Sequence, residues 1–244
     1  MLLVVLCASV VATAFISGIF GMAGGLILMG ILLALMSVER AMVIHGLVQF
    51  ASNGWRAVLW WRSIRWRVFR GYAMGAAVVV VLMSVLQARL DRATVMLVLG
   101  ATPFLAYLLP DRLGLNVDRT GHSFACGLVC MGLQMLSGVS GPLLDTFFVR
   151  SAMTRHEVVS TKAAVQTLSH ATRIGFFGFL LAASGGELGP GLLALLVGSA
   201  IAGTSASRLV LDRLSDADFR QLTQRLVLAI GGVYLGWGAW ELAR

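Results

Sequence analysis

The sequence predicts an all-α fold: a polytopic transmembrane helix bundle of two homologous halves in inverted topology, with a broken or re-entrant helix as the first segment of each half. Three observations support this prediction: a strongly apolar composition, a glycine and polar motif that occurs twice, and an uneven distribution of arginine between alternate loops. We expect residues 1–109 to form the first repeat, residues 110–120 a linker, and residues 121–244 the second repeat.

The composition is that of a polytopic membrane protein. Of the 244 residues, 58% are hydrophobic and only 12% are charged, whereas about a quarter of a soluble domain is charged. The net charge of +8 comes from 18 arginines and one lysine, and the arginines cluster in short loops between apolar runs. A positive-inside bias explains this pattern, so we expect no nucleic-acid partner. The three cysteines lie in apolar segments, and we expect no disulfide framework, metal site or cofactor.

The repeated motif has a glycine part and a polar part. The glycine part reads Ser17-Gly18-Ile19-Phe20-Gly21 in the first half and Ser137-Gly138-Val139-Ser140-Gly141 in the second, 120 residues later. The polar part contains Gln49, Ser52, Asn53 and Arg56, and it recurs 117 residues later as Gln166, Ser169, His170 and Arg173. Both polar sets lie in apolar segments long enough to cross a bilayer, where uncompensated polar groups are costly. This combination indicates a polar site between the two halves.

Apolar runs and their interruptions predict the helices in order. Glycines at 18, 21, 24 and 25 weaken a straight helix, so the first segment is predicted in two pieces, and the 121–153 segment is interrupted in the same way. Ser140-Gly141-Pro142 is typical of a helix start within that second interruption. A basic loop is expected over residues 62–70. The expected helices cover about 2–20 with a continuation to 36, then 41–61, 71–87, 93–109, 121–138 with a continuation to 153, 157–181, 190–206 and 222–242.

The basic residues of the loops predict the topology. If each broken pair enters and leaves on one side, as a re-entrant hairpin or as two full spans, the inner loops hold 12 basic residues and the outer side 4. If each broken pair is one bent span, the count becomes 7 inside and 9 outside, so the first arrangement is favoured. The halves are then inverted, as in many secondary transporters. We expect a multi-pass protein of the bacterial inner membrane with both termini on the outer (periplasmic) side.

The glycine breaks have two interpretations. A helix that begins at membrane depth presents unpaired N–H groups and a positive dipole end to an anion. The alternative is close packing of helices through small residues. Because the motif repeats, with helix-start chemistry in its second copy, we include its members among the candidate substrate-binding residues: Ser17, Gly18, Gly21, Ser137, Gly138, Ser140 and Gly141.

The polar stripes place further candidates on one face of each helix. Their spacing of i, i+4 and i+7 is met by Gln49, Asn53 and Arg56 and again by Gln166, His170 and Arg173. Amide, imidazole and guanidinium groups are mostly hydrogen-bond donors, which suits an oxyanion. Either arginine could instead extend to a membrane interface. Asp145 is the only obvious acid within the apolar segments.

Two equivalent positions, His45 and Lys162, each precede the glutamine of a stripe by about one turn. Either side chain could form an entry gate, and a structural role is the alternative. His170 could relay protons because imidazole titrates near neutrality, although packing is the commoner role of a single helical histidine.

At these residues the chain resembles the TauE/SafE (sulfite exporter) family of probable membrane transporters. The resemblance covers most of the chain and rests on Ser17-Gly-x-x-Gly21-x-x-Gly24-Gly25, Ser137-Gly-x-x-Gly141-Pro142, Thr154-Arg-His-Glu157 and the paired stripes. It implies transport or export of small anions, often sulfite, sulfoacetate or related organosulfur compounds. Here Ala23 interrupts the first glycine cluster, and no proline follows that cluster.

The combined expectation is a secondary transporter that exports a small anion by alternating access. The alternatives are a passive anion channel and a non-transporting membrane scaffold. An enzyme is least expected, because the chain has no Walker motif, nucleophile elbow or zinc-protease helix. The expected partners are a small anionic substrate and the lipid bilayer, with a proton as a candidate coupling ion and a homodimer as a candidate assembly.

Overall fold

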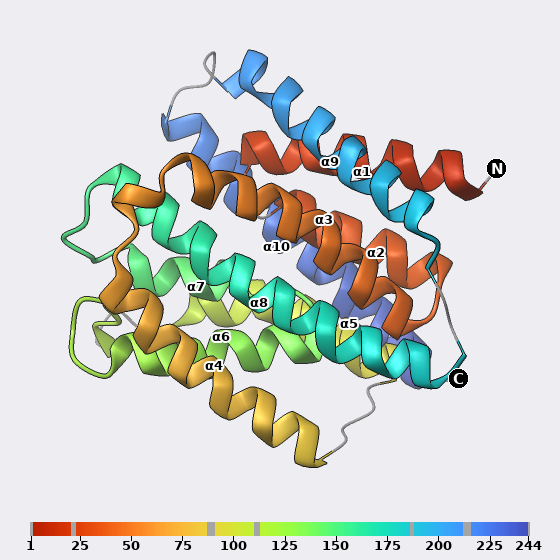
Figure 1. The fold of residues 1–244 in the computed structure, drawn as a ribbon, viewed down its shortest axis with the longest axis horizontal. Helices are drawn as coiled ribbons and strands as arrows, with labels where there is room; N and C mark the ends of the chain where they lie inside the picture. Colours follow the sequence, from red (N-terminus) through yellow and green to blue (C-terminus); the bar gives the residue numbers. More distant parts are fainter. Residues whose placement is uncertain are drawn as a thin grey trace.

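The computed structural model describes residues 2–20, 23–86, 91–109, 113–185, 188–211 and 216–243, and the regular elements within these ranges are all helical. The all-α prediction is confirmed. The elements, shown in Figure 1, are α1 (Leu2–Phe20), α2 (Ala23–Leu35), α3 (Val38–Leu59), the short 3₁₀ helix η1 (Trp61–Ser63), α4 (Trp66–Leu86), α5 (Arg92–Leu108), α6 (His122–Ser137), α7 (Gly141–Phe148), α8 (Arg155–Ala183), α9 (Pro190–Leu211) and α10 (Asp216–Leu242).

Two helices in the described part of the chain are long and apolar enough to cross a membrane by length and composition alone. They are Trp66–Leu86 and the Pro190–Ser207 portion of α9. The central helices α3, with 22 residues, and α8, with 29, are at least as long, but they carry the polar stripes. Each contains a buried histidine and at least one basic residue, Arg56 in α3 and Lys162 and Arg173 in α8.

Two expected boundaries are wrong, for identifiable reasons. The basic stretch 62–70 is not one loop, because α4 already begins at Trp66. Val68 is buried while Arg67 and Arg70 are exposed, so this stretch has the apolar face that a helix needs. The helix expected to reach residue 153 ends at Phe148, and the N–H of Ser151 turns back to the Phe148 carbonyl.

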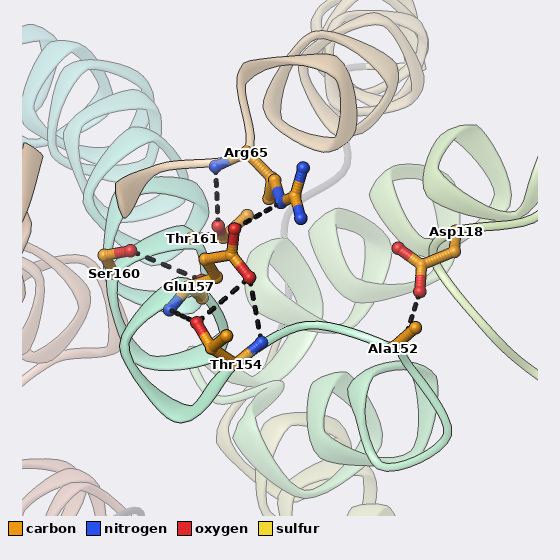
Figure 2. Close-up of polar contacts among 7 residues, drawn as sticks. All are labelled: Arg65, Asp118, Ala152, Thr154, Glu157, Ser160 and Thr161. Atoms are coloured by element: carbon orange, nitrogen blue, oxygen red, sulfur yellow. Dashed lines mark hydrogen bonds and ion pairs between the residues drawn. The ribbon is translucent and has the colours of Figure 1, made fainter. Parts of the chain in front are cut away.

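The N-terminus of α8 is fixed by a capping box, which Figure 2 shows. Thr154 Oγ1 accepts the Glu157 N–H at 3.4 Å, and Glu157 Oε2 accepts the Thr154 N–H at 2.8 Å. The same carboxylate pairs with Arg65 Nε at 2.8 Å, and the Arg65 N–H donates to Thr161 Oγ1. These bonds tie the start of α8 to the turn before α4.

A second side-chain cap begins α5. The Asp91 carboxylate accepts the Thr94 hydroxyl at 2.6 Å and the Thr94 N–H at 2.9 Å, and these bonds lower the pKa of Asp91 below its ordinary value. The cap is therefore complete at neutral pH and is lost only when acid protonates the carboxylate.

Each broken segment forms a helical hairpin. In the first, Gly24 at the start of α2 lies against Thr13 and Ser17 of α1 so closely that a Cβ would collide with backbone. In the second, the Val117 N–H before α6 donates to the Phe147 carbonyl at the end of α7 at 3.1 Å. This bond joins the two open ends of the second hairpin, and in the first hairpin Leu6 of α1 and Leu35 of α2 line a common pocket. With eight residues, α7 is about 12 Å long, which is less than half of a hydrocarbon core of about 30 Å.

The helices pack in pairs that join the two halves of the chain. The most extensive contacts join α3 with α8, α1 with α9, α5 with α10, and α4 with α6; α3 with α8 and α1 with α9 lie side by side in Figure 1. The α3/α8 pair is antiparallel, because Gly46 lies beside Ile174, Gly54 beside Thr167, and Trp60 beside His156.

The two ends of the molecule differ in their connections. At one end, Leu6 of α1, Met36 after α2 and Ser184 after α8 line a common pocket, and Arg92 pairs with Glu241 near the C-terminus. At the other end lie Arg65, Asp118, Ala152 and Glu157 (Figure 2). Arg92 also donates to the Met36 carbonyl, so the N-terminal end of α1 and the C-terminal end of α10 lie at the same end of the bundle, as Figure 1 also shows.

Candidate functional site

A cavity of about 410 Å³ lies between α3, α6, α7 and α8, beside the C-terminal part of α1. Eleven of the sixteen residues that line it are polar or charged, and they come from both halves of the chain. The polar residues around it are Ser17, His45, Gln49, Asn53, Arg56, Gln134, Ser140, Asp145, Lys162, Gln166 and His170.

The break between α6 and α7 forms one wall. Gly138 ends α6 with a φ of 81°, a left-handed conformation that favours glycine, and its N–H bonds to the Gln134 carbonyl at 3.0 Å. Ser140 then precedes α7, and Pro142 occupies the first turn. Gly138, Ser140 and Gly141 all line the cavity, so the backbone at the start of α7 borders it.

Arg173 lies behind this wall. Its side chain is fully buried, Nη1 donates to the Gly138 carbonyl, and Nη2 donates to His45 Nδ1 at 2.7 Å. Because guanidinium can only donate, His45 Nδ1 must accept, and the His45 proton lies on Nε2, which donates to the Gly25 carbonyl at 2.9 Å. This chain of bonds connects the start of α2 to the end of α6.

A second network contains a residue that the sequence did not indicate. Gln134 Nε2 donates to His170 Nδ1 at 2.9 Å, and the Ser140 hydroxyl donates to Gln134 Oε1 at 3.1 Å. Gln134 is buried and lines the cavity. The repeat could not reveal it, because the matching position 120 residues earlier is Ala14. The available signal was a single amide in an apolar helix, one turn before the glycine break.

The cavity carries more positive than negative charge. Lys162 of α8 pairs with Asp145 of α7, and both line the cavity. Arg56 also lines it, and Arg173 lies directly behind. Within the described residues neither arginine forms an ion pair, so their two charges have no carboxylate partner there.

The structure brings most of the predicted site residues to this cavity. Those that line it are Ser17, His45, Gln49, Asn53, Arg56, Gly138, Ser140, Gly141, Lys162, Gln166 and His170. Arg173 and Ser137 are buried outside the lining, and the Ser137 hydroxyl donates to the Leu133 carbonyl at 3.0 Å. Gly18 belongs to α1, and Gly21 lies outside the described residues.

The fold and the cavity define a class: a helical membrane protein with a buried, positively charged polar site at two helix breaks. Comparison with known families is consistent with this class. The family described as Sulfite exporter TauE/SafE matches residues 5–234, and the chain belongs to this family. Its members are membrane transporters of sulfite and other anions rather than enzymes, so membrane location and anion transport apply to this chain. A search of curated proteins gave no match, and a search of solved structures gave none.

Proposed function

We propose that the protein is a secondary transporter that exports a small oxyanion, sulfite or a small organosulfur anion, by alternating access. The observation that carries this proposal is the cavity between α3, α6, α7 and α8, which combines hydrogen-bond donors from both halves with an excess of positive charge. Family membership supports the class of substrate.

The donor chemistry of the lining favours an oxyanion. Gln49 and Gln166 each offer an amide NH₂, and no hydrogen bond from either is found in the described part of the chain. The N-terminus of α7 adds backbone N–H groups that lack helical partners. Together with Arg56, these groups can replace part of an anion's hydration shell.

Matching contacts in the two halves support an inverted repeat. His45 and Lys162 are equivalent under the 117-residue offset, and Gly25 and Asp145 are equivalent under the 120-residue offset. His45 donates to the Gly25 carbonyl, and Lys162 pairs with the Asp145 carboxylate. The antiparallel packing of α3 with α8 is the arrangement that such a repeat requires. We therefore propose that the two hairpins are re-entrant and related by a pseudo-two-fold axis.

The distribution of charge supports the proposed orientation in a bacterial inner membrane. One end of the bundle contains a hollow lined by Arg65, Arg67, Arg70 and Arg119. Exposed tryptophans at 60, 61 and 66 lie beside this end, as is typical of a membrane interface. We propose that it faces the cytoplasm, which places both termini in the periplasm.

Binding and flux measurements test the proposed function. Purified protein is titrated with sulfite, methanesulfonate, sulfate and acetate, and then reconstituted in liposomes for exchange measurements. We expect a sulfur oxyanion to bind and to exchange across the membrane, and Gln166→Leu to weaken binding about fivefold, the effect of one hydrogen bond of about 1 kcal/mol. Absence of binding by every anion would refute the proposal. Flux that can never be driven against a gradient would identify a channel instead.

A further inference from the structure

Two buried histidines lie next to each other at the cavity. The ring centroids of His45 on α3 and His170 on α8 are 6.0 Å apart, with an interplanar angle of 64°. Both side chains line the cavity, and both are almost fully buried. Their hydrogen-bond partners differ, and this difference assigns them different roles.

His45 has no nitrogen available for a further proton. Nδ1 accepts from Arg173 Nη2 at 2.7 Å, and Nε2 donates to the Gly25 carbonyl at 2.9 Å. A proton added at Nδ1 would place an N–H group against the guanidinium N–H and would add a second positive charge at hydrogen-bond distance. His45 is therefore held in its neutral form.

His170 has a partner that can adapt to protonation. Its Nδ1 accepts from the Gln134 amide at 2.9 Å, and a hydrogen bond from Nε2 is not found among the described residues. Rotation of the Gln134 amide by half a turn would present Oε1 to a protonated Nδ1. The same rotation would turn Nε2 toward Ser140, so that the Ser140 hydroxyl accepts and its own proton becomes free to donate.

We propose that His170 is a proton-binding site that fills together with the anion, so that the transporter moves a proton with each anion; this proposal rests on the proposed function. The proton enters from the aqueous phase that the cavity faces, binds Nδ1, and leaves to the opposite side when the anion is released. The freed hydroxyl of Ser140, which lines the cavity, supplies an additional donor to the anion.

The charges around His170 explain why the two ligands would bind together. The titratable and charged groups that line the cavity with it are His45 and Arg56 on α3, Asp145 on α7 and Lys162 on α8. Behind the lining lie Arg173 on α8, Tyr72 on α4, which bonds to Ser169, and Cys126 and Cys130 on α6. Three of these are cations and one is an acid already paired with Lys162, so the empty cavity disfavours an imidazolium. A bound anion adds negative charge beside His170 and therefore favours the imidazolium. By linkage, the imidazolium must in turn strengthen anion binding.

Calorimetric titration tests the proposal. Methanesulfonate, which stays ionised throughout, is titrated into the full-length protein at about pH 5.5 to 8 in buffers of different ionisation enthalpy, so that proton uptake is counted directly. Sulfite serves as a second probe after correction for its own protonation. We expect uptake of about one proton per anion, with affinity rising about tenfold per unit fall in pH over the same range.

Variants identify the group that takes up the proton. His170→Gln can accept from Gln134 but cannot be protonated, and it should bind the anion without proton uptake. If this variant does not fold, His170→Asn takes its place, since the first half carries Asn53 at the matching position. His156→Gln is the matched control. His156 contacts Trp60 outside the cavity, so this substitution should leave proton uptake unchanged.

Anion binding without proton uptake in the wild type, or proton uptake that persists without His170, would overturn the proposal while leaving the proposed function intact. Failure of both anions to bind would overturn both.

Discussion

At the scale of single residues, Arg173 shows how one side chain can organise a site without lining it. The spacing of the polar stripe places it on the same face as Gln166 and His170. In the structure Nη1 and Nη2 donate to the Gly138 carbonyl and to His45, whereas Nε has no hydrogen-bond partner among the described residues. The side chain is fully buried behind the cavity wall. Both acceptors are neutral, so the guanidinium charge still acts on the cavity. Arg173 therefore has a positioning role that we expect to be separable from anion contact.

Replacing Arg173 by methionine tests this role. Arg173→Met keeps much of the volume but leaves the Gly138 carbonyl and His45 Nδ1 without a donor, and each buried acceptor left unpaired costs about 1–3 kcal/mol. We expect a lower free energy of unfolding by at least about 2 kcal/mol, measured by denaturation in detergent, together with weaker anion binding. Gln166→Leu should weaken anion binding with little change in stability. If Arg173→Met kept its stability and lost only affinity, Arg173 would instead belong to the anion ligands.

At the scale of helices, glycine sets how closely elements approach. Gly127 of α6 lies against the backbone of Tyr72 in α4, and a Cβ there would collide with the Tyr72 carbonyl oxygen. Gly132, little more than one turn further along the same helix, has nothing within 4 Å of the place where a Cβ would stand. The two positions look alike in the sequence, but only one of them carries an interhelical contact.

The paired substitutions Gly127→Ala and Gly132→Ala test this difference. We expect Gly127→Ala to lower the free energy of unfolding by about 1–3 kcal/mol, because backbone cannot move aside as a flexible side chain can. Gly132→Ala should be neutral or stabilising, since alanine favours helix over glycine by up to about 1 kcal/mol. Thermal unfolding of both variants in the same detergent measures the effect. Equal stabilities would show that α4 and α6 do not pack this closely.

Much of the fold and of the cavity lining could be predicted from the sequence, and the features that could not be predicted depend on tertiary contacts. The spacing of residues along a helix predicts which face of the helix each side chain lies on. Gln49 and Asn53 were therefore expected on one face, and both line the cavity. The spacing does not predict how far a side chain lies from the cavity, so the sequence could not place Arg173 behind the wall formed by the α6/α7 break. Gln134 has no counterpart in the first half, and its role depends on the left-handed turn at Gly138. The early start of α4 depends on burial of Val68, a tertiary effect.

At the scale of the whole molecule, the packing of helices limits how the cavity could open alternately to each side. Every one of the most extensive helix interfaces joins a helix of residues 1–109 to one of residues 121–244. A rocking of these two halves as rigid bodies would disrupt all of them at once. Movement of the two hairpins, α1/α2 with α9 and α6/α7 with α4, against a fixed α3/α8 pair would preserve the α1/α9, α4/α6 and α3/α8 interfaces. We therefore expect the hairpins to move.

A disulfide between α3 and α8 distinguishes the two kinds of movement. A Cβ at Gly54 would stand 3.7 Å from Thr167 Cγ2 and 4.0 Å from Thr167 Oγ1, so side chains at these two positions face each other across the interface. A disulfide, whose Cβ atoms are about 3.5–4.5 Å apart, is within reach of a small adjustment there. Neither residue lines the cavity. In a background without the cysteines at 7, 126 and 130, Gly54→Cys with Thr167→Cys should form a crosslink and still exchange anions in liposomes, because the α3/α8 pair stays together when the hairpins move. Each single-cysteine variant controls for the substitutions themselves. Exchange that stops on oxidation and returns on reduction would instead show that the halves rock apart along α3 and α8, since this is the one contact that the crosslink fixes.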